Sequence, residues 1–217
     1  MATQRTARGF DRLVNFTDAA VAIALTLLVL PLVDLGPEAA KESLGHVFAA
    51  HWQNILAFVI SFAVIGNLWL VHHRIFELAG DYDYRLAVLD LAWLATITAL
   101  PFTTNVIANA SGSPAVLGLY LGNIFAASAL ALALRVYLSR HPQLLRPEIG
   151  PELHVAAAAV PTGILLVVVV LAVLFPSIGS LWLLLMFAGS PIERAIIRHQ
   201  GAQEPDTTTR TAPPAGG

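Results

Sequence analysis

Apolar stretches as long as a bilayer is thick run through most of this chain. A helix needs roughly 20 predominantly apolar residues to cross the hydrocarbon core, and only 12% of the 217 residues are charged whereas 57% are hydrophobic. The pattern predicts an all-α membrane protein with six transmembrane helices in one domain, residues 1–199, followed by a disordered polar tail, residues 200–217. The predicted spans are residues 17–33, 52–72, 86–108, 115–138, 153–175 and 178–196.

The distribution of positive charge predicts how these spans are oriented. If the N-terminus is cytoplasmic, only Lys41 among the twelve basic residues falls outside. Cytoplasmic loops of membrane proteins carry such an excess of basic residues, so we expect both termini, and with them the tail, in the cytoplasm. The basic residues on that side are Arg5, Arg8, Arg12, Arg74, Arg85, Arg135, Arg140, Arg146, Arg194, Arg198 and Arg210.

Polar residues cluster where the first span begins, in the sequence RLVNFTDAAVAIALTLLVLPL. Asp18 in the first turn is expected to favour the positive end of the helix dipole, and Asn15 or Thr17 to cap the free amides. Capping explains one of these residues but not the whole set, which also includes Arg12. We therefore expect the helix to be held in position by them, as a helix that lines a pathway would be.

Bulky aliphatic residues form one stripe on the first span. Ile23, Leu27 and Leu30 follow i, i+4, i+7 spacing, and Thr26 lies close to the same face. Such a stripe most often faces lipid or packs against another helix, but rings of aliphatic side chains also gate pores by excluding water. The Thr26 hydroxyl either faces a pore or bonds back to the Ala22 carbonyl.

The second span ends in a group of side chains with polar atoms, Trp69, His72 and His73. Adjacent histidines point to different faces of a helix, unlike the i, i+4 spacing of a metal site, and the chain has no cysteine. We therefore predict no metal and no cofactor. Either histidine is expected to satisfy Asp18 or to contact a neighbouring subunit.

One further acid, Asp90, lies inside the third span. It is expected within two turns of the cytoplasmic end, where Arg85 and Arg135 are the nearest opposite charges. We interpret it as a structural ion pair rather than as the central acid of an ion-coupled transporter.

The first outer loop carries three acids at four-residue spacing, Asp34, Glu38 and Glu42, against Lys41 alone. In a ring of subunits these acids would form an anionic outer mouth that enriches cations. The alternative is an ordinary solvated loop face.

Other function classes find no support in the sequence. It contains no phosphate-binding loop, no nucleophile elbow and no zinc-protease motif, so we predict that the protein is not an enzyme. The formal net charge of −2 gives no reason to expect nucleic acid as a partner.

The run Arg12-x-x-x-Phe16-Thr17-Asp18 followed by AAVAIALTLLVL resembles the transmembrane protein 175 family of potassium channels, whose motif is R-x-x-x-F-S-D. The WLVHHRIF end of the second span and LPFTT in the third are also similar to that family. Thr17 stands where the motif has serine, which keeps the hydroxyl. The resemblance covers the first three spans.

The resemblance implies a homotetramer of six-helix subunits in a bacterial plasma membrane, with the first helices lining a potassium pore. By the matching residues, Ile23, Leu27 and Leu30 form the constriction and Thr26 contributes to selectivity. Arg12, Phe16, Thr17 and Asp18 would hold the pore helix together with Trp69 and His72 or His73. The competing readings are a secondary transporter for a small ion or solute and an accessory membrane protein that packs against a partner.

Overall fold

The computed structural model describes residues 7–110, 113–146 and 155–174, and this part of the chain is helical. The long helices α1, α5, α6 and α7 pack together as a bundle, and α8 packs against α7 at its edge. The helices are α1 (Ala7–Leu27), α2 (Leu30–Val33), α3 (Gly36–Ala39), α4 (Leu44–Ala50), α5 (Trp52–Leu78), α6 (Tyr84–Asn109), α7 (Pro114–Arg140) and α8 (Val155–Leu174), with a 3-10 turn η1 (Pro142–Leu144) after α7.

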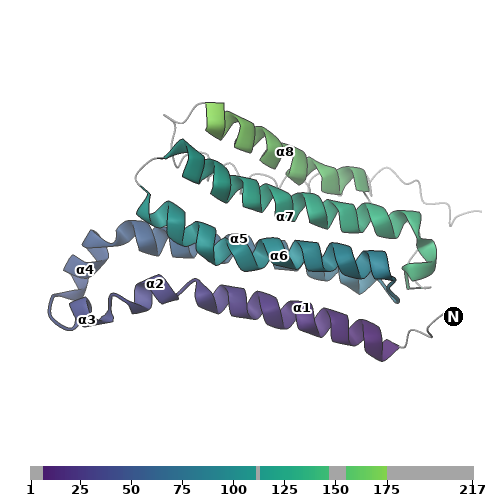
Figure 1. Ribbon diagram of the computed structural model, residues 1–217, viewed down its shortest axis with the longest axis horizontal. Helices are drawn as coiled ribbons and strands as arrows, with labels where there is room; N and C mark the ends of the chain where they lie inside the picture. Colours follow the sequence, from purple (N-terminus) through teal and green to yellow (C-terminus); the bar gives the residue numbers. More distant parts are fainter. Residues whose placement is uncertain (1–6, 111–112, 147–154, 175–217) are drawn as a thin grey trace, which may run out of the picture.

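Helix α6 lies at the centre of the bundle. It packs against α1, α5 and α7, and α7 packs in turn against α8. Figure 1 shows α1 along one edge of the bundle and α8 along the other, with the short helices α2 to α4 at one end. Helix α1 therefore contacts the other helices with one side only, which leaves its opposite side uncovered in the protomer.

Local sequence signals explain where two of the long helices begin. Asp83 is the N-cap of α6, and its carboxylate accepts a 2.8 Å hydrogen bond from the Leu86 amide. Pro114 occupies the first turn of α7, where the absent N–H costs no intrahelical bond. Between such ends the chain is almost wholly apolar, as a membrane-spanning helix requires.

The predicted spans and the observed helices agree for the first four. Within the described residues, four segments are long and apolar enough to cross a membrane: 8–33, 52–78, 84–109 and 114–140. Helix α8 falls on the fifth predicted span. The sixth span and the polar tail lie outside the described residues.

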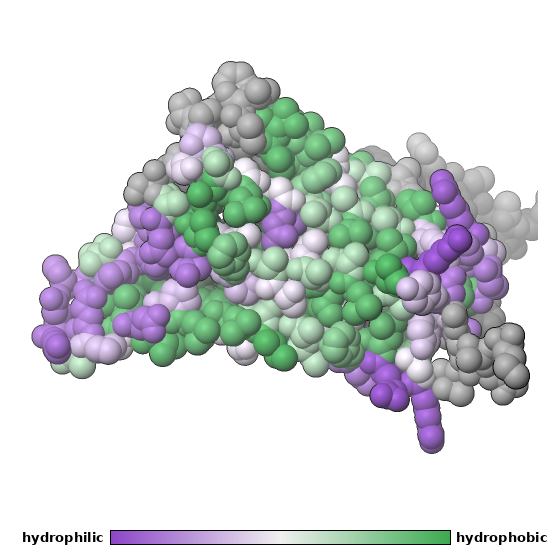
Figure 2. All heavy atoms as spheres, in the orientation of Figure 1, coloured by the Kyte–Doolittle hydropathy of each residue, from purple (hydrophilic) through white to green (hydrophobic). Residues whose placement is uncertain are grey.

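Figure 2 shows a mostly hydrophobic band between two hydrophilic ends, as expected for a multi-pass membrane protein.

The prediction for the start of the first helix was wrong. Helix α1 begins at Ala7, ten residues before the predicted start, so Thr17 and Asp18 lie in its interior and are not capping residues. Their hydroxyl and carboxylate are therefore free to bond to other helices. The helix also ends earlier, at Leu27, and a turn separates it from α2.

A hydroxyl network joins the three central helices. Thr104 of α6 donates a 2.8 Å hydrogen bond to Ser61 of α5, whose Oγ lies 2.9 Å from the hydroxyl of Tyr120 of α7. All three side chains are buried. Because lipid offers no hydrogen-bond partners, hydroxyls inside a bundle are stabilised by bonding to one another, and this network favours one mutual arrangement of α5, α6 and α7.

Candidate functional site: a buried polar network beside the uncovered face of α1

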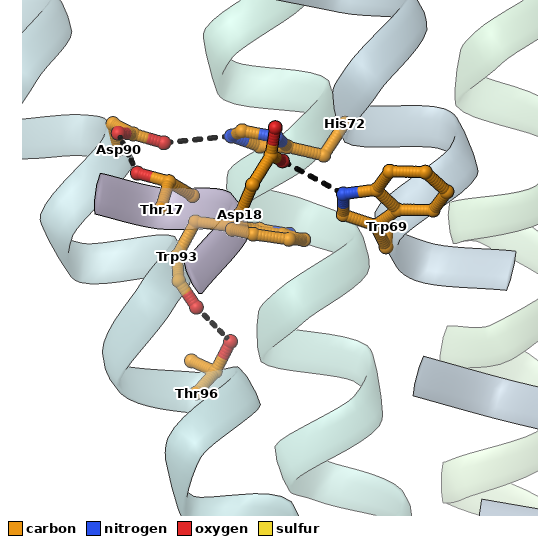
Figure 3. A network of polar contacts seen from close by, with 7 residues as sticks. All are labelled: Thr17, Asp18, Trp69, His72, Asp90, Trp93 and Thr96. Atoms are coloured by element: carbon orange, nitrogen blue, oxygen red, sulfur yellow. Dashed lines mark hydrogen bonds and ion pairs between the residues drawn. The ribbon is translucent and has the colours of Figure 1, made fainter. Parts of the chain in front are cut away.

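Asp90 is the centre of a buried polar network that joins α1, α5 and α6 (Figure 3). The Thr17 hydroxyl donates a 2.7 Å hydrogen bond to Asp90 Oδ2, and His72 Nε2 lies 2.6 Å from Asp90 Oδ1. Both carboxylate oxygens are therefore bonded, each to a different helix. A buried acid inside an apolar bundle is costly unless it is paired in this way.

Aromatic rings fix the orientation of His72. Its imidazole stacks on the indole of Trp93 at a centroid distance of 3.9 Å and on the ring of Phe76 at 4.5 Å. His72 is six residues from the end of α5 and Asp90 six from the start of α6, so each lies roughly 9 Å along its helix from the connection between them. The network thus occupies the end of the bundle at which α1 begins.

A second contact of α1 lies beside the first. Trp69 Nε1 donates a 2.8 Å hydrogen bond to Asp18 Oδ1 (Figure 3). Trp69 also stacks on His73, whose Nε2 lies 3.5 Å from Glu77 of the same helix. Two consecutive residues of α1 therefore reach two different helices, Thr17 reaching α6 and Asp18 reaching α5.

These contacts correct two expectations. Asp90 contacts Thr17 and His72, where an ion pair with Arg85 or Arg135 was expected. Neither histidine bonds to Asp18 within the described protomer, since His72 pairs with Asp90 and His73 contacts Trp69 and Glu77. A contact of either histidine with a neighbouring subunit stays a prediction. Of the two histidines, His72 enters the network because its position on α5 faces the core, whereas His73 is only partly buried.

Two motif residues lie outside this network within the described protomer. Phe16 is 56% exposed and the Arg12 side chain is also exposed. Both lie on the uncovered side of α1, which the other helices of the protomer do not reach.

The aliphatic stripe lies on the same uncovered side. Ile23 is 60% exposed and Leu27 43%. Leu30 is also exposed, at 52%, but it belongs to α2, so the expected stripe on one continuous helix ends at Leu27. The opposite face of α1 is buried, with Thr17, Val21 and Ala24 at most 2% exposed. Thr26 is exposed, and its hydroxyl donates a 2.7 Å hydrogen bond to the Ile23 carbonyl rather than to that of Ala22.

At the other end of α1, two of the three outer acids pair with histidines. His51 Nε2 lies 2.9 Å from Glu38 Oε2, and His46 Nε2 lies 3.1 Å from Glu42 Oε2. Asp34 is exposed at the end of α2. The outer loop is thus folded into short helices held together by these pairs, and Asp34 is exposed without such a histidine pair among the described residues.

The network includes residues that sequence reasoning did not place in it, namely Asp90, Phe76 and Trp93. Asp90 carried a usable signal, because an acid within a span must find a partner, and His72 and Asp90 lie equally far from the connection between their two helices. The aromatic rings gave no signal, since stacking partners depend on how the helices are rotated. Among the described residues, no three His, Asp or Glu side chains gather as ligands for one metal ion.

Comparison with known proteins identifies relatives of this chain. The sequence profile of the family described as "Endosomal/lysosomal potassium channel TMEM175" matches residues 12–101. The rat protein named endosomal/lysosomal proton channel TMEM175 is 28% identical over 146 residues, which cover 66% of this chain and 29% of that protein. A potassium channel of Streptomyces collinus is 35% identical over 97 residues, which cover 45% of this chain and 47% of that protein. The matches thus span less than half the length of these relatives.

A solved structure has the same fold. The crystal structure of a lysosomal potassium-selective channel TMEM175 homologue from Chamaesiphon minutus aligns with a TM-score of 0.60 at 22% identity, covering 89% of this chain and 97% of that one. The resemblance expected from the motif is confirmed by these findings, and it extends over the part of the chain that holds the polar network.

Proposed function

Because residues 12–101 of this chain belong to the TMEM175 family, we propose that it is the subunit of a homotetrameric cation channel that favours potassium. The channel lies in a bacterial plasma membrane with both termini in the cytoplasm. The proposal goes beyond the family match, because the matches cover only part of each relative. It rests chiefly on the two-sided character of α1.

The observation that carries the proposal is the contrast between the two faces of α1. One face is buried and is tied to α5 and α6 by side-chain hydrogen bonds from Thr17 and Asp18. The other face presents Ile23 and Leu27, which the rest of the protomer leaves uncovered, and Leu30 at the start of α2 is exposed as well. Four copies arranged around an axis would bring this stripe together into three aliphatic rings, with the polar network holding each helix in place from behind.

Permeation through such rings is passive. An ion passing Ile23, Leu27 or Leu30 must shed part of its hydration shell, because aliphatic side chains offer no replacement ligands. Potassium is less strongly hydrated than sodium, so a dehydration barrier favours it. Thr26 lies between two of the rings, and because its proton is used in the bond to the Ile23 carbonyl, its oxygen has lone pairs left for a passing cation.

The acids of the outer loop supply the attraction for cations. Asp34, Glu38 and Glu42 repeated around the axis would lower the electrostatic potential at the outer mouth and raise the local cation concentration. The histidine pairs of Glu38 and Glu42 weaken this effect when the histidines are protonated.

The proposal also specifies which ion passes through the pore. The Streptomyces relative is named a potassium channel, and the rat relative a proton channel. We favour potassium because a dry aliphatic constriction provides no chain of titratable groups for proton transfer.

Ion flux through the purified protein tests the proposal. The protein is reconstituted into liposomes loaded with KCl, and potassium efflux is followed while an added proton carrier compensates the charge. A channel gives flux that rises linearly with the gradient. Flux that saturates and depends on a coupled ion would instead indicate a secondary transporter. Verified folded protein without flux would favour the accessory reading.

A further inference from the structure

An aromatic clamp holds the first turn of α1. Phe10 is 7% exposed, and its ring stacks on Phe76 of α5 at a centroid distance of 6.0 Å with an interplanar angle of 16°. The Tyr82 ring, from the connection between α5 and α6, lies at a centroid distance of 6.3 Å from the Phe10 ring, tilted by 37°. Phe10 therefore contacts both the end of α5 and the connection that follows it.

Gly9 permits the close approach of Tyr82. A Cβ atom at Gly9 would lie 3.1 Å from the Tyr82 hydroxyl oxygen, which is too close for an undisturbed contact, and 3.5 Å from the nearest ring carbon, which is an ordinary contact. The tight contact is thus made by the hydroxyl alone. The effect of the Tyr82 hydroxyl can therefore be tested separately from that of its ring, by replacing Tyr82 with phenylalanine.

The connection that carries Tyr82 is itself held by the segment after α7. The amides of Gly80 and Asp81 donate to the Leu144 carbonyl at 2.8 and 3.2 Å. In the other direction, the Arg146 amide donates to the Leu78 carbonyl at 3.0 Å, and Arg146 Nε donates to the Ala79 carbonyl at 3.2 Å. The clamp therefore rests on a backbone bridge between two connections at the same end of the bundle.

The positions of Phe10, Thr17 and Leu27 along α1 mean that a displacement of the helix at Phe10 would also displace Leu27. Phe10 is seven residues, or roughly 10 Å, before Thr17 on the same buried face, whereas Leu27 is ten residues, or roughly 15 Å, beyond it. The helix is continuous over this length. If Thr17 acts as the pivot, a shift of 1 Å at Phe10 moves Leu27 by about 1.4 Å in the opposite direction.

We propose that Phe10 is a positioning residue for the aliphatic stripe of α1, acting through the clamp that it forms with Phe76 and Tyr82. The buried polar network fixes the middle of α1, and the clamp fixes its tilt. The bridge to Leu144 and Arg146 makes that tilt depend on the segment after α7. The effect on ion flow rests on the proposed function, whereas the effect on the position of Leu27 does not.

Cysteine labelling tests the position of Leu27 directly, because the chain contains no cysteine. The Leu27→Cys variant is purified, and the rate of its reaction with a small thiol reagent is measured with and without Phe10→Leu. The expected result is a severalfold change in labelling rate in folded protein. A matched Phe62→Cys reporter on the exposed side of α5 is expected to label at the same rate in both backgrounds.

A second set of variants keeps the test decisive if Phe10→Leu does not fold. Gly9→Ala presses a methyl group against the Tyr82 hydroxyl, and Tyr82→Phe removes that oxygen. We expect Gly9→Ala to change both the Leu27→Cys labelling rate and the single-channel conductance severalfold. In a Tyr82→Phe background the same substitution is expected to change neither. Because Gly9→Ala is made in both the wild-type and the Tyr82→Phe background, the higher helix propensity of alanine affects both alike and does not contribute to the difference between them.

The outcomes separate the two proposals. A labelling change rescued by Tyr82→Phe, in protein that carries no current, would support the clamp and contradict the channel. Wild-type current with neither labelling nor conductance altered by Gly9→Ala would overturn the clamp and leave the channel standing. A loss of folded protein without any change per folded channel would show a role in stability alone and would also overturn it.

Discussion

The Thr17 hydroxyl and the Asp90 carboxylate, 73 residues apart in sequence, are joined by a 2.7 Å hydrogen bond between α1 and α6. His72 occupies the second carboxylate oxygen, so Asp90 ties α1 and α5 to the central helix at once. Because the bond lies in a buried site, its loss is not compensated by water. It therefore supplies both stability and a fixed position for α1.

Replacing Thr17 isolates this bond. Thr17→Val keeps the shape of the side chain but removes the donor, and we expect it to lower the free energy of unfolding by about 1.5–3 kcal/mol, the usual range for a hydrogen bond to a charged group. Thr17→Ser retains the hydroxyl and is expected to cost less. Thermal unfolding of both variants in detergent measures the difference. No destabilisation by Thr17→Val, or a larger cost for Thr17→Ser than for Thr17→Val, would show that the methyl packing of Thr17 matters more than its hydrogen bond.

The His72–Asp90 contact is expected to show coupling in a double-mutant cycle. His72→Phe keeps a ring between Trp93 and Phe76 but leaves Asp90 short of one partner, whereas Asp90→Asn removes the charge. We expect the double variant to be more stable than the sum of the single effects predicts, with a coupling energy of about 1–3 kcal/mol. Unfolding midpoints of the four proteins give this term. Strict additivity would show that the 2.6 Å contact contributes nothing.

The aliphatic stripe is expected to control conduction. Ile23→Asn or Leu27→Asn places a hydrogen-bonding group where an ion would otherwise lose water, so conductance should rise and the preference for potassium should fall. Val59→Asn on α5 is the matched control, because Val59 is also an exposed aliphatic residue, at 54%. Single-channel recordings compare the three variants. If Val59→Asn produced the same change, the pore would have to be assigned to a different face.

The outer acids are expected to act through long-range electrostatics. Asp34→Asn removes the exposed acid that has no histidine pair, and we expect it to reduce conductance at low ionic strength and to have little effect at about 1 M salt, where the Debye length is only about 3 Å. Lys41→Gln is the control of opposite sign and should raise conductance at low salt. Conductance measured from 20 mM to 1 M salt checks both. An effect of Asp34→Asn that persists at high salt would indicate a direct contact with the ion.

The sequence was sufficient to predict the first four spans, because lipid imposes one requirement on every residue within them. Runs such as 52–72 and 115–138 stay apolar whatever lies next to them, so their existence follows from composition and length. The ends were less predictable. Helix α1 continues back to Ala7 through Arg8, Asp11 and Arg12, since charged residues outside the hydrocarbon core are compatible with a helix.

The sequence indicated which residues belong to the polar network better than it indicated which of them bond to each other. Thr17, Asp18, Trp69 and His72 stand out as polar groups in apolar surroundings. Which of them meet depends on the rotation of each helix, and adjacent histidines such as His72 and His73 differ by about 100° in direction. The same limit explains why the expected ion pair of Asp90 was wrong, and why the contact of Phe10 with Tyr82 left no trace in the sequence pattern.

The reversal potential of the purified protein in a planar bilayer, with KCl on one side and NaCl on the other, tests the central claim most directly. The account predicts currents that reverse close to the potassium equilibrium potential, and a shift toward zero in Ile23→Asn. Currents that reverse at zero would contradict potassium preference, and currents that follow an imposed proton gradient would identify protons as the permeant ion. Folded protein without current would contradict the channel itself.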